Sequence, residues 1–284
     1  MKETQLSFRY LSSATPPLLT LAGLESFDAL AAFSLRADLS TALEEEVAHE
    51  LELQRRDFAF ANQIHGDRVA ILDRAPDVPP SVDALIAARP GIFPAVQTAD
   101  CLPILLLDPV HRVTAAIHAG WKSTVLRITR KVLRLLNGEF GTDSSDLIAF
   151  MGPAIGTCCY EVDAAVLEPF RKNAPSASRF IVTHEELKSR HGAVGENDGS
   201  SRTLGILSRG LNRKPIPPTR PGNQSFRIDL AGVNHFELVL GGVSEQSIYH
   251  SGLCTACYPQ LFYSYRRDSG QPGRHIAVAG FRVR

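Results

Sequence analysis

Short, unbroken runs of apolar residues recur along the chain and predict buried β-strands. One run lies in AVQTADCLPILLLDP, bounded by Pro103 and Pro109, and a second lies in RVTAAIHAG. Further runs in LIAFMGPAIG and in the C-terminal HIAVAGFRVR predict two more strands, the first of which leads into a tight Gly-Pro loop. Continuous apolar runs of this length, bounded by turn residues, are typical of fully buried strands.

Apolar residues at helical spacing predict helices between these strands. In KSTVLRITRKVLRLLNGEFG the apolar positions recur every three or four residues, and Asn137-Gly138 supplies a stop signal. Asp163 opens a helix in DAAVLEPFRKNA as its N-cap, and Asp229 does the same in DLAGVNHFELVLGGV, which ends at a Gly-Gly pair. This mixed order predicts an α/β or α+β sandwich around one sheet system, with residues 1–284 forming a single domain.

The segment from His184 to Asn223 breaks this pattern. It is rich in Gly, Ser, Pro, Asn and Arg and has no apolar periodicity. We interpret residues 184–223 as a flexible surface insertion without catalytic residues, since long aperiodic polar segments are usually linkers or disordered. A lid over the site and a basic patch that contacts phosphate are the alternatives for the same composition.

Composition narrows the class of partner and the compartment. The 284 residues are 44% hydrophobic and 21% charged, with a formal net charge of zero, which argues against general attraction to nucleic acid or to a membrane surface. No apolar stretch approaches the ~20 residues that span a bilayer, and the N-terminus has no signal-like apolar region. Five cysteines, an odd number in a long chain, fit a reducing compartment, and we expect a cytoplasmic protein.

Two histidines and one cysteine at the breaks between apolar runs are the main candidates for chemistry. They are His65 in NQIHGDRV, Cys101 in QTADCLPILLLDP and His118 in AAIHAGW. Three nitrogen or sulfur ligands without a fourth in close spacing form the ligand set of a catalytic zinc, which keeps one position open. Taken singly, each residue is more simply explained as a packed thiol or a hydrogen-bonded ring. Spacing alone also does not establish that Cys101 and His118 meet, since one enters its strand while the other leaves.

Two aspartates accompany these candidates. Asp100 precedes Cys101, and it either accepts a proton or orients a ligand, or it is a turn residue at the entry to a strand. Asp83 in VDALIA either lines the pocket or forms a turn. The residues alone leave both assignments open.

The other four cysteines form no complete metal site by their spacing. Cys158 and Cys159 are adjacent and cannot easily bond to each other, whereas Cys254 and Cys257 have the spacing of half a zinc knuckle. No second pair at suitable spacing accompanies them, so a second metal site is not expected. The nine histidines contain no His-x-His pair, which weighs against a multicopper oxidase.

Eight segments, in their order along the chain, resemble the YfiH family, which was long labelled multicopper polyphenol oxidase or laccase-domain protein. The segments are QIHGDRV, DALIAARPG, TADCLPILLLDP, AAIHAGWKST, GPAIGTCCYEV, FRIDLAGVN, CTACYPQLFYSYRRD and GRHIAVAGF, and the match runs from about Phe33 to Phe281. The combination of the motifs TADC and HAGW is specific to this family. The resemblance implies a layered α/β/β/α fold and a zinc ion bound by His65, Cys101 and His118.

The same resemblance implies an enzyme with purine nucleoside phosphorylase and adenosine deaminase activity. Its small-molecule partners would be phosphate and a purine nucleoside: adenosine, inosine, guanosine or methylthioadenosine. In phosphorolysis, phosphate attacks the anomeric carbon; in deamination, zinc-activated water attacks the purine carbon that carries the amino group. Whether zinc or copper is bound stays open at this point.

Arginines on the matching segments are the candidates for phosphate binding, because a guanidinium donates paired hydrogen bonds and stays charged. Arg36 lies where the family carries Ser-x-Arg followed by paired glycines. Here Ala37 and Asp38 replace those glycines, which argues against an anion-cradling role for this loop. Arg266 and Arg267 in YSYRRD are therefore preferred, and an exposed surface pair is their alternative explanation.

Three further interpretations use the same residues. Cys101 as a thiolate nucleophile with His118 as base would give a cysteine-dependent amidase, such as an editing hydrolase of peptidoglycan precursors. A laccase-like polyphenol oxidase is another alternative, and a binding module that uses zinc only for stability is the last. Metal content separates these classes, because a zinc-bound thiolate is neither free nor a good nucleophile.

Overall fold

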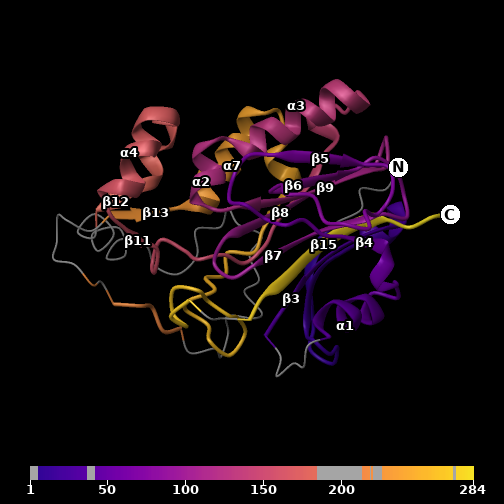
Figure 1. Cartoon of the computed structure of the whole chain (residues 1–284), viewed down its shortest axis with the longest axis horizontal. Helices are drawn as coiled ribbons and strands as arrows, with labels where there is room; N and C mark the ends of the chain where they lie inside the picture. The colour runs from indigo at the N-terminus through magenta and orange to yellow at the C-terminus, as the bar shows by residue number, and fades with distance from the viewer. Residues whose placement is uncertain (1–5, 37–41, 184–212, 218, 220–225, 271–272) are drawn as a thin grey trace.

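Two six-stranded sheets form the centre of the molecule. The computed structural model describes residues 6–36, 42–183, 213–217, 219, 226–270 and 273–284. The first sheet has the order β1 (Ser7–Leu11), β2 (Leu18–Ala22), β3 (Ala29–Ser34), β15 (His275–Phe281), β7 (Phe93–Thr98) and β4 (Phe58–Ala59). The second has the order β14 (Ile248–His250), β10 (Ile148–Met151), β8 (Leu102–Asp108), β9 (Val113–Ala119), β6 (Ala84–Ala87) and β5 (Val69–Leu72). A small sheet of β11 (Glu161–Val162), β13 (Phe226–Ile228) and β12 (Ile181–Thr183) lies at one end (Figure 1).

Helices cover the outer face of each large sheet. On the first sheet, α1 (Leu43–Glu50) packs Val47 into a cluster with Leu18 and Val278. On the second sheet, α3 (Ile128–Phe140) and α7 (Leu230–Leu240) pack Leu136 and Leu238 against the strands. Figure 1 shows α1 on one side of the molecule and α3 and α7 on the other, with the sheets between them. The expected α/β/β/α layering is confirmed.

The remaining helical segments are short and lie between strands. They are α2 (Trp121–Val125), α4 (Ala164–Asn173) and the 3-10 turns η1 (Leu24–Phe27), η2 (Arg55–Asp57), η3 (Ser144–Asp146), η4 (Pro175–Phe180) and η6 (Glu245–Ser247). The predicted N-caps are confirmed: Asp163 accepts a hydrogen bond from the backbone of Val166, and Asp229 accepts one from Gly232. Within the described residues, no helix is long and apolar enough to cross a membrane.

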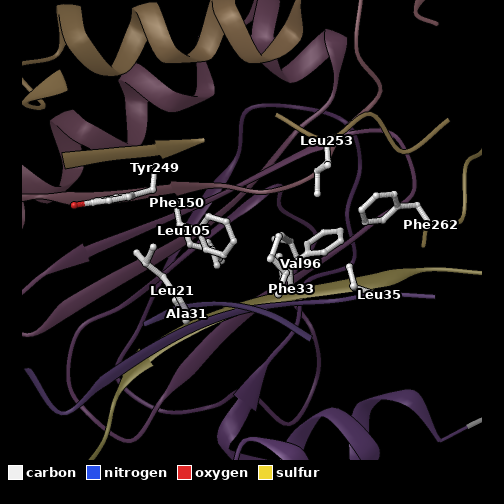
Figure 2. Packing of buried hydrophobic residues seen from close by; sticks show 14 of the residues in the cluster. Leu21, Ala31, Phe33, Leu35, Val96, Leu105, Phe150, Tyr249, Leu253 and Phe262 are labelled. Atoms are coloured by element: carbon white, nitrogen blue, oxygen red, sulfur yellow. The ribbon is translucent and has the colours of Figure 1, made fainter. Parts of the chain in front are cut away.

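A shared apolar core joins the two sheets. Phe33 and Val96 come from the first sheet and meet Leu105 and Phe150 from the second, and all four are at most 1% exposed. Figure 2 shows these side chains between the two sets of strands. The expectation of one sheet system is therefore wrong, because apolar runs mark strands as buried without stating which sheet each strand joins.

Strands β8 and β9 are buried along their whole length. One face contacts the first sheet and the other contacts α3 and α7, so neither face is exposed to solvent. This explains the continuous apolar runs LPILLL and VTAAI in place of the alternation of a half-exposed strand. All four predicted strands are present, as β8, β9, β10 and β15.

The amphipathic segment 122–141 differs from its predicted form. Instead of one helix it forms α2 and α3, which are separated at Arg127 with a left-handed φ of 59°. The second helix continues through Asn137 and Gly138 and ends at Gly141, whose φ of 69° and backbone bond to the carbonyl of Asn137 cap it. A helix commonly ends at a glycine in the left-handed conformation, as at Gly141. A glycine inside a helix, such as Gly138, lowers the stability of the helix only mildly, so α3 continues through it.

The predicted insertion 184–223 falls largely outside the described residues. Residues 213–217 and 219 are described, and they contact the body of the protein. The backbone N–H of Lys214 donates to the carbonyl of Cys257 at 2.9 Å, and the backbone N–H of Thr219 donates to the carboxylate of Glu161 at 2.9 Å. The boundary of a dispensable insertion therefore lies before residue 213.

Candidate active site

The pairing of β8 with β9 brings Cys101 and His118 together. These strands are antiparallel, with Leu102 opposite Ala119 and Pro103 opposite His118, so the start of one adjoins the end of the other. His65 arrives from the loop between β4 and β5. Ligand atoms of the three side chains all lie within 4.8 Å of one another. The three candidates that sequence spacing could not join therefore form one cluster.

Asp83 holds both histidines of this cluster. Its carboxylate is fully buried and accepts hydrogen bonds from the backbone N–H groups of His65 at 2.9 Å and Gly66 at 2.7 Å. It also pairs with Nδ1 of His118 at 2.8 Å, which leaves Nε2 of that ring as the free ligand atom. Such a carboxylate behind a ligating histidine fixes the tautomer and the orientation of the ring. Asp83 is therefore neither a pocket-lining residue nor a simple turn former.

Backbone conformation at the site is unusual at two positions. His65 has a φ of 54° and Asp100 has a φ of 88°, both in the left-handed region that non-glycine residues rarely adopt. Hydrogen bonds to Asp83 hold the first, and side-chain hydrogen bonds of Asp100 itself hold the second. Local strain of this kind persists where the surrounding contacts determine the geometry of a site.

Cys101 and His118 shift each other toward a thiolate and an imidazolium. Burial raises the pKa of the Cys101 thiol, but hydrogen bonds and charge from His118 and His65 outweigh it and lower the pKa from 9.0 to about 7. Burial likewise lowers the pKa of His118, whereas Asp83 and Cys101 raise it to about 9. Asp83 keeps a pKa below its usual value despite burial, because His118, Gly66 and His65 donate to it. A cation at this position would replace the proton that the pair shares.

The chemistry of the donor set fits a metal ion. Two imidazoles and one thiol offer the ligand types of zinc and copper, and three protein ligands leave a coordination position for another molecule. Gly120 lets its backbone lie close to Cys101 and His65, because a Cβ added there would lie 3.1 Å from Sγ of Cys101 and 3.3 Å from Nδ1 of His65. His118 is 2% exposed and His65 is exposed, so one side of the cluster faces solvent.

A cavity of about 620 Å³ opens over the cluster. This volume suits a small-molecule ligand. Its walls combine aromatic, amide and cationic side chains, contributed by Trp121, Tyr160, Tyr265, Asn62, Gln63, Gln97, Lys122, Arg266 and Arg274. The aromatic rings can stack on a planar ligand, and the cations can face an anion.

Asp100 lies in the wall of this cavity, but its carboxylate is engaged within the protein. Oδ1 accepts from the hydroxyl of Thr255 at 2.6 Å, and Oδ2 accepts from the hydroxyl of Ser264 at 3.0 Å and from the backbone N–H of Arg266 at 2.7 Å. Burial raises the pKa of this carboxyl in spite of these donors. Asp100 thus joins the turn between β7 and β8 to the segment that carries Arg266.

The two consecutive arginines have different surroundings. Arg267 uses all five N–H groups of its guanidinium, on the carboxylate of Asp268 and on the carbonyls of Thr255, Ala256 and Phe262. Arg266 lines the cavity, stacks over the ring of Tyr160 and donates from Nη1 to a single backbone carbonyl, that of Glu161, at 2.7 Å. Of this pair, Arg266 is the one with donors left for a ligand.

Arg36 does not share the cavity. Its Nη1 donates to the carbonyl of Pro259 at 3.1 Å, and its guanidinium stacks over Tyr263. It is not among the described residues that line the pocket, and positions 37 and 38 lie outside the described part of the chain. The expectation of a substrate contact from Arg36 gains no support from this placement.

Several pocket residues escaped the sequence interpretation. Gln63 and Gln97 bond reciprocally, side chain to backbone, at 2.8 Å in both directions and form one wall. Lys122 and Arg274 add two cations to the lining. Gln63 and Lys122 adjoin the ligand motifs in QIHG and HAGWK, so proximity in sequence was a usable signal for them. Arg274 carries no such signal, because it reaches the cavity from the start of β15.

The four remaining cysteines converge, contrary to expectation. Cys158, Cys159, Cys254 and Cys257 place their sulfur atoms within 4.8 Å of one another. Sequence spacing does not reveal this cluster, because the partner of Cys254 and Cys257 is an adjacent pair about a hundred residues away and not a second Cys-x-x-Cys pair.

Comparison with known proteins identifies relatives over most of the chain. A family model described as "Multi-copper polyphenol oxidoreductase laccase" matches residues 38–196 and 207–282. "Purine nucleoside phosphorylase YlmD" of Bacillus subtilis is 28% identical over 247 residues, covering 84% of this chain and 76% of the relative. "Adenosine deaminase RL5" from an unknown prokaryotic organism is 30% identical over 237 residues, covering 80% and 76%.

The fold has close counterparts among solved structures. The crystal structure of the hypothetical protein YfiH from Bacillus licheniformis superposes with a TM-score of 0.76 and 26% identity, covering 97% of this chain and 99% of that one. A purine nucleoside phosphorylase of Bacteroides thetaiotaomicron is 32% identical over 196 residues, and the match covers 69% of this chain and 59% of that relative.

Proposed function

The chain belongs to the multi-copper polyphenol oxidoreductase laccase family, and from this premise we propose that it is a zinc-dependent purine nucleoside phosphorylase that also deaminates adenosine. The observation that carries the proposal is the cluster of His65, Cys101 and His118 at the base of a cavity lined by aromatic and cationic side chains. Relatives named for both reactions support the choice of substrate class. Five free thiols fit a reducing compartment, the cytoplasm in this proposal.

Zinc is the metal we assign to the three ligands. Bound there, it would supply a Lewis acid that stabilises negative charge on an adjacent oxygen or lowers the pKa of water. A multicopper oxidase needs several copper centres built from many histidines. Among the described residues, only the cluster of His65, Cys101 and His118 combines histidine with two further ligands.

The protein's own residues divide the work of binding. Trp121, Tyr160 and Tyr265 present rings on which a purine base can stack. Arg266 and Lys122 provide positive charge for phosphate, and Asp100 positions Arg266 through its backbone N–H. In phosphorolysis a phosphate oxygen attacks the anomeric carbon, the glycosidic C–N bond breaks, and the base departs with the electron pair.

The test is a set of parallel incubations of metal-quantified protein. Adenosine, inosine and methylthioadenosine are each supplied with and without phosphate, and the released base, sugar phosphate and ammonia are measured. Base release that requires phosphate, together with ammonia release from adenosine that does not, supports the proposal. Protein with a full complement of metal that releases neither base nor ammonia contradicts it.

A cysteine-dependent amidase is the second candidate, and one observation favours it. The mutual shift of Cys101 and His118 toward thiolate and imidazolium is the arrangement that activates a nucleophilic cysteine. Metal content separates the two proposals. Metal-free protein that hydrolyses an amide and loses activity on alkylation of Cys101 would support the amidase, whereas one zinc ion on the three ligands supports the phosphorylase.

A further inference from the structure

Four thiols converge on the side of the fold next to the candidate active site. Cys158 and Cys159 lie in the loop between β10 and β11, and Cys254 and Cys257 lie in the loop after β14. An isolated parallel bridge between Ala154 and Cys254 joins the two loops. Three of the four cysteines are buried, and Cys158 is half-buried. The group is separate from the active-site cluster, with which it shares no residue.

The distances between the sulfur atoms match those of a tetrahedral thiolate site. Sγ of Cys257 lies 3.4 Å from Sγ of Cys158 and 3.5 Å from Sγ of Cys159, and all four ligand atoms lie within 4.8 Å. A zinc ion with Zn–S bonds of about 2.3 Å holds tetrahedral sulfurs about 3.8 Å apart. A disulfide would require about 2.05 Å. An iron–sulfur cluster places several iron atoms between its cysteines and needs a wider cage.

Hydrogen-bond donors and positive charges surround the sulfurs. The backbone N–H of Gly156 donates to Sγ of Cys254 at 3.2 Å, and that of Ile216 donates to Sγ of Cys159 at 3.3 Å. The guanidinium of Arg213 adds a positive charge beside Cys158 and Cys257. Donors of this kind stabilise sulfur in the thiolate form and form the second shell of a metal site.

A buried arginine adds to this electrostatic environment. Arg227 on β13 is 2% exposed, and its Nη1 donates to the carbonyl of Cys158 at 3.2 Å. A zinc ion with four thiolates carries a net charge of about −2, which two neighbouring guanidinium groups offset. Four neutral thiols would give these two cations no negative partner in the cluster.

We propose that Cys158, Cys159, Cys254 and Cys257 bind a structural Zn²⁺ ion. Four protein ligands close its coordination shell, which distinguishes it from the three-ligand active-site cluster. The ion would join the β10–β11 loop to the loop after β14, with the backbone N–H of Ile216 and the positive charge of Arg213 beside the same group of sulfurs.

The position of this ion connects it to the active site. Between its ligands Cys254 and Cys257 lies Thr255, whose hydroxyl bonds Asp100 and whose carbonyl accepts from Arg267. On the other loop, Tyr160 follows Cys159 and lines the cavity. The ion therefore holds in place the segments around Thr255 and Tyr160, which form two walls of the pocket, without contacting a bound ligand.

The decisive measurement is the metal content of two reciprocal variants. Cys101→Ala removes a ligand of the active-site cluster and leaves the four thiols, whereas Cys257→Ser does the reverse. We expect Cys101→Ala to retain one zinc ion per chain. Replacing that ion with Co²⁺ should give the strong visible and near-ultraviolet absorption of tetrahedral cobalt with four thiolates. Cys257→Ser should lose this spectrum and denature at a lower temperature.

Two outcomes overturn the proposal. One is a metal-free Cys101→Ala protein in which all four thiols react freely with a thiol reagent in the folded state. The other is the formation of one or two disulfides in protein purified without reductant, detected as a mass that is lower by two hydrogen atoms for each disulfide. If Cys257→Ser does not fold, the metal content and cobalt spectrum of Cys101→Ala still decide the question. Both readouts are independent of nucleoside turnover, so failure of the proposed enzymatic function leaves them unaffected.

Discussion

Single residues behind the ligands set the geometry of the candidate active site. Asp83 contacts the backbone of His65 and the ring of His118, so one carboxylate orients two of three ligands from positions 18 and 35 residues away. The site therefore contains two groups of residues. Those of the first group contact a bound metal or ligand, and those of the second group position the first. Asp100 belongs to the second group, because three donors occupy its carboxylate.

Replacing Asp83 with Asn should weaken metal binding without unfolding the protein. The amide cannot accept from His118 and from two backbone N–H groups as the carboxylate does, so we expect affinity to fall by roughly 10- to 100-fold. Competition with a chromophoric chelator measures this change. Asp67→Asn is the matched control, since Asp67 lies in the β4–β5 loop close to His65 but pairs with the half-buried Lys131. Equal affinities of the two variants would show that Asp83 does not orient the ligands.

Alkylation of Cys101 in metal-free protein should follow the lowered pKa of its thiol. The thiolate is the reactive form, and a pKa lowered to about 7 means that it predominates above neutral pH. The rate of reaction with iodoacetamide at the peptide containing Cys101 should therefore decline as the pH falls through about 7. In His118→Ala the midpoint should move to higher pH. A wild-type midpoint at the ordinary thiol value would refute the thiolate–imidazolium pair.

At the scale of elements, the segment between β14 and β15 carries two adjacent arginines with opposite roles. Arg266 faces the cavity, whereas Arg267 binds the carbonyls of its own loop. The sequence alone does not distinguish these two arginines. The path of the loop places the side chain of Arg266 in the cavity and that of Arg267 against the backbone of the loop.

Arg266→Ala should raise the Michaelis constant for phosphate more than that for the nucleoside. A hydrogen bond to a charged group contributes roughly 1.5–3 kcal/mol, so we expect an increase of roughly tenfold or more. Arg267→Ala is the control: it should lower the melting temperature and leave the ratio of the two constants unchanged. Steady-state kinetics with each substrate varied in turn measures both. An unchanged phosphate constant in Arg266→Ala would direct attention to Lys122 and Arg274.

Helix α3 shows how far periodicity alone assigns a buried face. Leu135 and Leu136 are consecutive apolar positions, but Leu136 is 1% exposed in the core under the second sheet and Leu135 is only partly buried. Leu136→Ala should lower the free energy of unfolding by roughly 2–5 kcal/mol, and Leu135→Ala should lower it by clearly less. Chemical denaturation compares the two. Equal losses would mean that the helix presents a different face to the sheet.

For the molecule as a whole, the predicted insertion can be tested with the boundary that the structure supplies. Replacing residues 184–212 with a short Gly/Ser linker should leave turnover within about tenfold, or roughly 1.4 kcal/mol of barrier. Extending the replacement to residue 223 removes the backbone contacts of Lys214, Ile216 and Thr219 and should lower the melting temperature. A loss of several hundredfold in the shorter replacement would instead identify the segment as a lid or substrate clamp.

Local patterns in the sequence were sufficient for strands β8, β9, β10 and β15, for two helix N-caps and for listing the candidate ligands. All of these features depend on neighbours a few residues apart in the sequence. They are the buried strands, the helix N-caps at Asp163 and Asp229, and the histidines and cysteine at strand ends. Those short-range preferences are present in the chain before it folds. The exceptions were also local: Arg127 interrupts a helix that periodicity continues, and Gly141 ends it later than Asn137 and Gly138 suggest.

Tertiary structure decided which of these residues meet. The antiparallel register of β8 and β9 joins Cys101 to His118, and the pairing of β6 with β9 sets Asp83 behind them. Cys158 and Cys257 approach across 99 positions of sequence. Contacts of this separation depend on the order of strands in a sheet, which depends on the packing of the whole chain. That is why the three-ligand cluster was visible as a list of residues, whereas the four-thiol cluster became visible only in three dimensions.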